Sequence, residues 1–164
     1  LSVINPALTE QLEEFLSNSK RVAILGIGND LRTDDGIGPF VVDNLQTNND
    51  RVLIEDVGSV PEAFTSKISE FGADRVILID AADMRKPVGH IELVTKNRIG
   101  GITISTHSMP LSLLMEYLEQ QTEAKTILIG IQPQNLQFGE GMTPELEAVG
   151  KKLISMIDSI LKTY

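Results

Sequence analysis

The 164-residue chain contains no cysteine, no tryptophan and only two histidines. Without cysteine it cannot form disulfide bonds, thiolate nucleophiles or cysteine-based zinc sites. Because only 4% of its residues are aromatic, aliphatic side chains must dominate the core. At 41% hydrophobic, the chain is apolar enough to fold as one domain of ordinary size.

Basic residues are also scarce: 14 lysines and arginines face 23 acidic residues, for a net charge of −9. This balance argues against nucleic acid as the main partner and against docking on anionic membranes. No apolar run approaches the length of a membrane span, and the acidic residues near the start do not fit a signal peptide. We therefore expect a cytoplasmic protein without membrane insertion, and a monomer.

Short apolar runs alternate with segments of helical spacing. Strands are predicted at 22–28, 52–57, 75–81, 90–95 and 126–131. Helices are predicted near 8–16, 37–45, 64–71, 111–118 and 146–160.

The fourth predicted strand follows the third after only about eight residues, too few for a parallel crossover, which needs roughly a dozen. Strands 75–81 and 90–95 are therefore expected to run antiparallel. The sequence predicts an α/β fold: a three-layer helix–sheet–helix sandwich with a five-stranded mixed, mostly parallel twisted sheet. We expect a single domain over 1–164, with a helical extension at 1–20 and the core at 21–164.

Ligands of such sheets bind outside the carboxyl ends of the strands. The first strand ends in Gly26 and Gly28, but a dinucleotide fingerprint would also require glycine where the chain has Leu31. No phosphate-binding loop is present either. The glycines instead indicate close backbone approach. Of the two acids that follow, Asp34 is expected to cap a helix, while Asp35 is free to face the crevice.

Asp80 ends the third predicted strand after four aliphatic residues, and His107 precedes a predicted helix. Both are expected at the same sheet edge as Asp35. Two carboxylates and one imidazole suit Zn²⁺, Ni²⁺, Fe²⁺ or Mn²⁺. Taken alone, the spacing also fits solvated strand ends and a surface histidine. His90 is expected to be structural, and no serine-hydrolase or zinc-protease signature is present.

Four ordered motifs together resemble the hydrogenase maturation endopeptidases, in particular the hydrogenase 3-type branch. They are Gly26-x-Gly28-Asn29-x4-Asp34-Asp35-Gly36-x-Gly38, Leu78–Met84, Thr106–Leu111 and Ile129–Pro133. The resemblance implies an endopeptidase that removes a C-terminal peptide from the precursor of the [NiFe] hydrogenase large subunit after nickel insertion. It further implies that Asp35, Asp80 and His107 contact the nickel. The nickel would come with the substrate; no organic cofactor is expected, and the resting protein would be metal-free or carry adventitious zinc.

Five positions at the predicted edge are candidates for further roles. Asp35 and Asp56 are candidate catalytic carboxylates of an aspartyl-type mechanism, and Asn29, Gly58 and Gln132 are candidates for substrate binding. Two other functions fit the same residues. One is a non-catalytic nickel-checkpoint or chaperone protein that binds the precursor; the other is a small self-contained metallohydrolase.

Overall fold

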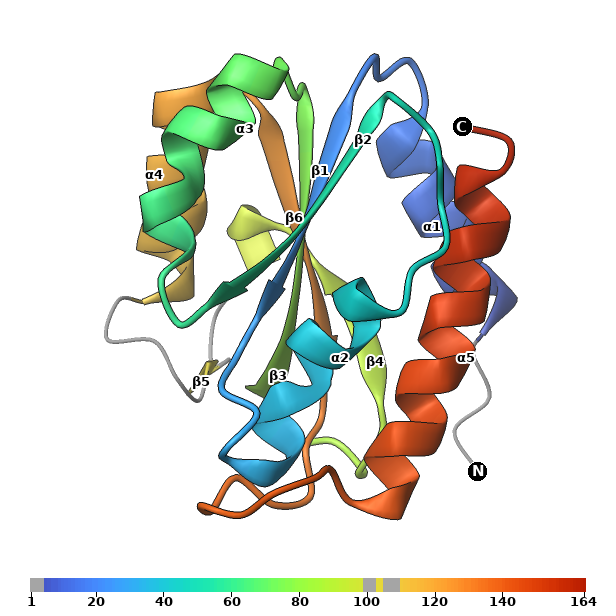
Figure 1. Ribbon diagram of the computed structural model, residues 1–164, viewed down its shortest axis with the longest axis vertical. Helices are drawn as coiled ribbons and strands as arrows, with labels where there is room; N and C mark the ends of the chain where they lie inside the picture. Colours follow the sequence, from blue (N-terminus) through green and yellow to red (C-terminus); the bar gives the residue numbers. More distant parts are fainter. Residues whose placement is uncertain (1–4, 99–102, 105–109) are drawn as a thin grey trace.

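The computed structural model describes residues 5–98, 103–104 and 110–164 (Figure 1). Its central sheet has the strand order β2-β1-β3-β6-β4. The strands are β1 (Val22–Ile27), β2 (Val52–Gly58), β3 (Arg75–Asp83), β4 (Ile91–Val94) and β6 (Lys125–Ile131). Since β1, β2, β3 and β6 are parallel and β4 is antiparallel, the predicted five-stranded mixed sheet is confirmed.

Helices cover both faces of the sheet, which confirms the predicted sandwich (Figure 1). One face carries α1 (Pro6–Leu16), α2 (Ile37–Asp43) and α5 (Pro144–Leu161). The other carries α3 (Thr65–Phe71) and α4 (Leu111–Thr122). Short 3₁₀ helices are η1 (Thr33–Gly36), η2 (Pro61–Phe64) and η3 (Lys96–Arg98). None of the described helices combines the length and apolar character that crossing a membrane requires.

Strand β4 runs antiparallel as predicted, but it pairs with β6 rather than with β3. The reason is that β3 is already flanked by β1 and β6, so β4 has to take the sheet edge. The sequence did not predict β5 (Thr103–Ile104), a two-residue strand that pairs antiparallel with the end of β3. This pairing continues β3 beyond the predicted end at residue 81 to Asp83.

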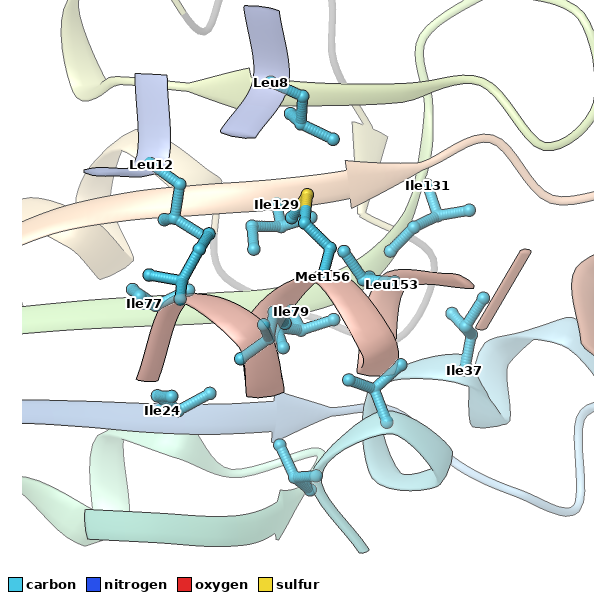
Figure 2. Close-up of a cluster of buried hydrophobic side chains, with 14 of the residues drawn as sticks. Leu8, Leu12, Ile24, Ile37, Ile77, Ile79, Ile129, Ile131, Leu153 and Met156 are labelled. Atoms are coloured by element: carbon cyan, nitrogen blue, oxygen red, sulfur yellow. The ribbon is translucent and has the colours of Figure 1, made fainter. Parts of the chain in front are cut away.

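The core is aliphatic, as the composition requires, and successive strand residues face alternate layers. Ile24, Ile77 and Ile129 face the layer of α1, α2 and α5 (Figure 2), whereas their neighbours in sequence face α3 and α4. Leu8 and Leu12 of α1 are buried in the first of these layers. The N-terminal helix therefore packs on the same core as α5.

The closest approach of a helix to the sheet lies where α2 crosses β1 and β3. A Cβ atom on Gly38 would lie 2.2 Å from the carbonyl oxygen of Ile27 and 2.5 Å from that of Ile79. A Cβ atom on Gly26 would lie 2.4 Å from the carbonyl oxygen of Gly38. Two glycines thus bring helix and strand backbones into direct contact, as the glycine pattern indicates.

We predict that Gly38→Ala destabilises the protein by roughly 3 kcal/mol, because backbone carbonyls cannot yield to the added methyl group. Urea unfolding measures the loss. Gly150→Ala in α5 is the matched control, since the added methyl would meet side chains rather than backbone, the nearest being the ring of Phe40 at 2.9 Å. Equal effects of the two substitutions would contradict the backbone-contact explanation.

Candidate functional site

Asp35 lies in η1, directly before α2, and is fully buried. Its Oδ2 accepts the backbone N–H of Asn29 at 2.7 Å. Gly28, at φ +144°, lies so close that a Cβ atom there would be 1.9 Å from the carbonyl oxygen of Asp35. The end of β1 therefore fixes both the backbone and the carboxylate of Asp35.

Asp80 is fully buried within the carboxyl-terminal half of β3. Within the described residues, neither of its carboxylate oxygens has a hydrogen-bond partner. Burial raises the pKa of Asp80 well above its usual value, and the negative charge of Asp35 raises it further. The backbone N–H of Ala81 offsets only part of this pKa shift and does not reach hydrogen-bonding geometry.

The structure thus brings Asp35 and Asp80 together at the edge where the sequence predicts them. A buried carboxylate without a donor, such as Asp80, is costly, and a cation bound between Asp80 and Asp35 would compensate both charges. Two carboxylates are hard oxygen donors, and an added imidazole would make the set suitable for a divalent metal ion of borderline hardness. His107, the predicted third ligand, lies outside the described residues, within which no three His, Asp or Glu side chains form a metal-binding cluster.

Asp34 is equally buried, but its carboxylate is saturated with hydrogen bonds. It accepts the backbone N–H groups of Gln134, Asn135 and Thr143 at 2.8–3.0 Å. It also accepts the hydroxyl of Thr143, the residue that precedes α5, at 2.8 Å. The expectation that Asp34 caps the helix following it is wrong, because neither η1 nor α2 has a side-chain cap. Asp34 instead ties η1 to the loop between β6 and α5.

Three other predicted residues lie where β1 and β2 end. The side chain of Asn29 accepts the N–H of Leu31, and the carbonyl oxygen of Gly58 accepts the N–H of Gly28 at 2.9 Å. Asp56 is exposed and accepts the N–H of Gly58 at 3.0 Å. The substrate-binding and catalytic roles of these residues stay predictions.

The charges of Asp56 and Asp35 act on different neighbouring carboxyl groups. Burial raises the pKa of Asp43, and the charges of Asp56 and Asp30 raise it further. The charge that acts on Asp80, in contrast, is that of Asp35. Of the two candidate catalytic carboxylates, Asp35 is therefore the one associated with Asp80.

Gln132 holds the turn that follows β3. Its Oε1 accepts the N–H of Met84 at 2.7 Å and that of Lys86 at 3.3 Å, and its Nε2 donates to Asp83 at 3.2 Å. The side-chain amide is thus engaged on both sides with this turn, and its predicted contact with substrate is not tested. His90 pairs with Glu92 at 2.9 Å on the edge strand, in keeping with a structural role.

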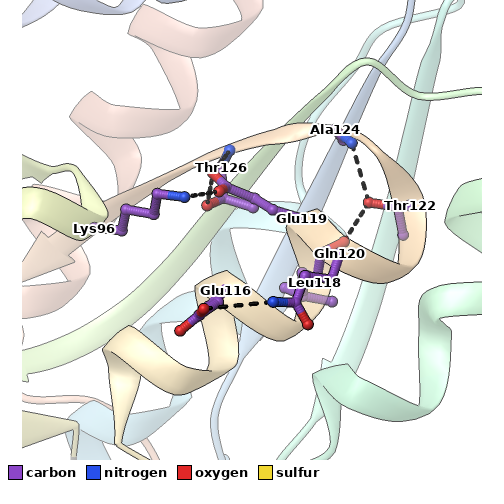
Figure 3. Close-up of polar contacts among 8 residues, drawn as sticks. All are labelled: Lys96, Glu116, Leu118, Glu119, Gln120, Thr122, Ala124 and Thr126. Atoms are coloured by element: carbon purple, nitrogen blue, oxygen red, sulfur yellow. Dashed lines mark hydrogen bonds and ion pairs between the residues drawn. The ribbon is translucent and has the colours of Figure 1, made fainter.

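The described residues on either side of the segment that contains His107 are anchored to neighbouring elements. Glu119 of α4 binds Lys96 of η3 at 2.5 Å and accepts both the N–H and the hydroxyl of Thr126 on β6 (Figure 3). After the segment, Leu111 is buried at the start of α4. These contacts connect η3, α4 and β6 into one unit.

Comparison with known proteins gives consistent results. Residues 40–160 match the family described as hydrogenase maturation protease. The hydrogenase 3 maturation protease of Escherichia coli K12 is 30% identical over 76% of this chain and 80% of its own length. The crystal structure of the [NiFe] hydrogenase maturation protease HycI from Thermococcus kodakarensis superposes with a TM-score of 0.82. It is 32% identical and covers 93% of this chain and 99% of that one. The solution structure of the E. coli endopeptidase HycI gives a TM-score of 0.74 at 27% identity, over 85% of this chain and 90% of that one.

We predict that Asp34→Ala costs roughly 3 kcal/mol of stability, because it leaves several buried backbone donors without an acceptor. The free energy of unfolding in urea measures this. Asp50→Ala, in an exposed loop, is the control and should change stability by less than about 0.5 kcal/mol. Similar losses for both variants would show that the Asp34 hydrogen bonds carry no special weight.

Asp80→Asn is expected to stabilise the metal-free protein by more than about 1 kcal/mol at neutral pH, because an amide is cheaper to bury than a carboxylate. The folded-state pKa of Asp80 is raised, so the folded protein holds a proton that the unfolded chain releases near pH 4. Wild-type stability should therefore fall as pH rises from about 4 through the folded pKa, relative to the variant. Unfolding curves across pH measure the difference; parallel pH profiles for the two proteins would contradict the prediction.

Proposed function

Because this chain belongs to the hydrogenase maturation protease family and is therefore a hydrolase of the endopeptidase type, we propose that it is a nickel-dependent processing enzyme. Its substrate would be the precursor of a [NiFe] hydrogenase large subunit, from which it removes a C-terminal peptide. The observation that carries the proposal is Asp80, buried beside Asp35 with both oxygens lacking a described partner.

This observation supports recognition of a metal ion that arrives with the substrate. Burial and the negative charge of a second acid destabilise an ionised carboxylate, and binding of a cation relieves both effects. Nickel already held by thiolates of the precursor would take its remaining ligands from Asp35, Asp80 and His107. The precursor would supply the soft ligands of the nickel ion, and this protein would supply the harder ones.

Binding of the metal would position the scissile peptide bond next to a carboxylate base. The base would take a proton from water, the water oxygen would attack the carbonyl carbon, and the amine would leave with a proton. Asp35 is the favoured base, because it is buried beside Asp80, whereas Asp56 is exposed to solvent. The N–H of Asn29 holds Asp35 in orientation.

We predict that Asp80→Asn, Asp35→Asn and His107→Ala each reduce cleavage of nickel-loaded precursor by at least about 100-fold, since each removes a ligand or the base. Intact mass spectrometry follows release of the peptide from purified precursor. Precursor without nickel should stay uncleaved by the wild-type protein.

The matched control is Asp83→Asn, which changes an exposed acid three residues after Asp80. This variant should cleave the precursor at nearly the wild-type rate. Asp56→Asn separates the two candidate bases: a wild-type kcat leaves Asp35 in that role, and a loss of kcat transfers it to Asp56. Wild-type cleavage by both Asp80→Asn and His107→Ala would overturn the proposed site.

A further inference from the structure

A lobe built from two loops projects beside the candidate site. The backbone N–H of Gly139 donates to the carbonyl oxygen of Leu31 at 2.9 Å, and that of Thr33 donates back to Gly139 at 3.1 Å. The hydroxyl of Thr33 donates to the carbonyl oxygen of Asn135 at 2.5 Å. The carboxylate of Asp34 accepts hydrogen bonds from the base of the same loop, so several hydrogen bonds connect the lobe to η1 and to the rest of the protein.

Two large apolar side chains on this lobe face solvent. Phe138 is 82% exposed, the highest value among the exposed large hydrophobic residues of the described chain, and Leu31 is 57% exposed. The guanidinium of Arg32 lies 5.7 Å from the centre of the Phe138 ring. Rigidly held, exposed aromatic side chains are typical anchors of protein interfaces.

Next to the lobe, a groove of about 520 Å³ is lined by residues of the two loops, of α2 and of the start of α5. Leu31, Pro39, Phe40 and Met142 supply its apolar lining. Its charged lining consists of Asp30, Asp43, Glu140 and Glu147, and no lining residue is basic.

The acidic side chains that line this groove repel one another. Burial, Asp56 and Asp30 all raise the pKa of Asp43. Among the described ion pairs, only Glu147 of the four lining acids has a cationic partner, Lys151 at 3.6 Å. A positively charged occupant would relieve the repulsion, and the protein's net charge of −9 would assist its approach.

We propose that this groove and the adjoining Phe138 lobe dock a segment of the hydrogenase precursor that combines lysine or arginine with an apolar side chain. The inference rests on the proposed function, because that function supplies the partner. Gly36, which lines the groove, directly follows Asp35, so the docked segment would end beside the candidate site. The groove would thus bind a segment of the precursor, while Asp35 and Asp80 would contact the metal ion that the precursor carries.

The test measures binding and cleavage separately, with purified nickel-loaded precursor from the same organism. Calorimetry gives Kd, and intact mass over time gives KM and kcat. Phe138→Ala and Glu140→Lys should each raise Kd and KM about tenfold and leave kcat unchanged, as expected for an interface anchor outside the reacting groups. Glu140→Lys should also reduce the dependence of Kd on salt.

Matched controls lie on the opposite face of the sheet. Leu113→Ala on α4 removes a side chain that is 53% exposed, and Glu70→Lys on α3 reverses an exposed charge; both should leave Kd unchanged. If the wild-type protein cleaves and the two groove variants match it in Kd and KM, the docking groove is wrong and the proposed function stands. If the wild-type protein binds without cleaving, the proposed function fails, and the groove is judged by Kd alone. Absence of both binding and cleavage would overturn both.

Discussion

The backbone contact between α2 and the sheet is the constraint on which the site depends. Because Gly26 and Gly38 carry no Cβ, α2 can cross the ends of β1 and β3 at a distance that no other residue permits. Since η1 immediately precedes α2, the position of this crossing fixes where η1 meets β1. Asp35 is consequently buried against Gly28 instead of projecting into solvent.

The contrast between two aspartates shows what the fold does with buried charge. Asp34 and Asp80 are both fully buried, yet Asp34 receives donors from three backbone N–H groups and a hydroxyl, while Asp80 has no described hydrogen-bond partner. A buried carboxylate whose hydrogen bonds are satisfied contributes to stability, whereas an unsatisfied one reduces it. A buried polar group that lowers the stability of the fold without a structural role is characteristic of functional positions, where stability is given up for binding or catalysis. The same residue type therefore supports the architecture at position 34, whereas at position 80 it is the candidate for chemistry.

The strength of the local signal decides which features the sequence alone could predict. Strands such as β3 were predictable because their apolar runs are continuous. The edge rule for parallel sheets predicted Asp35 near Asp80, and in the structure the charge of Asp35 acts on Asp80. The pairing of β4 with β6 was not predictable, because strand order depends on tertiary packing rather than on periodicity. No local pattern near Asp34 indicates that its carboxylate accepts hydrogen bonds from the backbone of a loop about 100 residues later in the chain. The engagement of Gln132 with the turn after β3 is likewise a long-range contact without a local pattern.

Asp34 also explains how the groove and the candidate site can act on one substrate. Its carboxylate holds the loop that carries Phe138, and its backbone is continuous with Asp35. A displacement of the lobe would therefore pull on η1, and a displacement of η1 would disturb the lobe. Because Asp34 connects both surfaces, the distance between the proposed docking groove and the candidate metal-contacting acids is set by covalent geometry and hydrogen bonds. Under the proposed function, a substrate would have to satisfy both surfaces at a fixed spacing, which a free metal ion or an unrelated cationic peptide could not do.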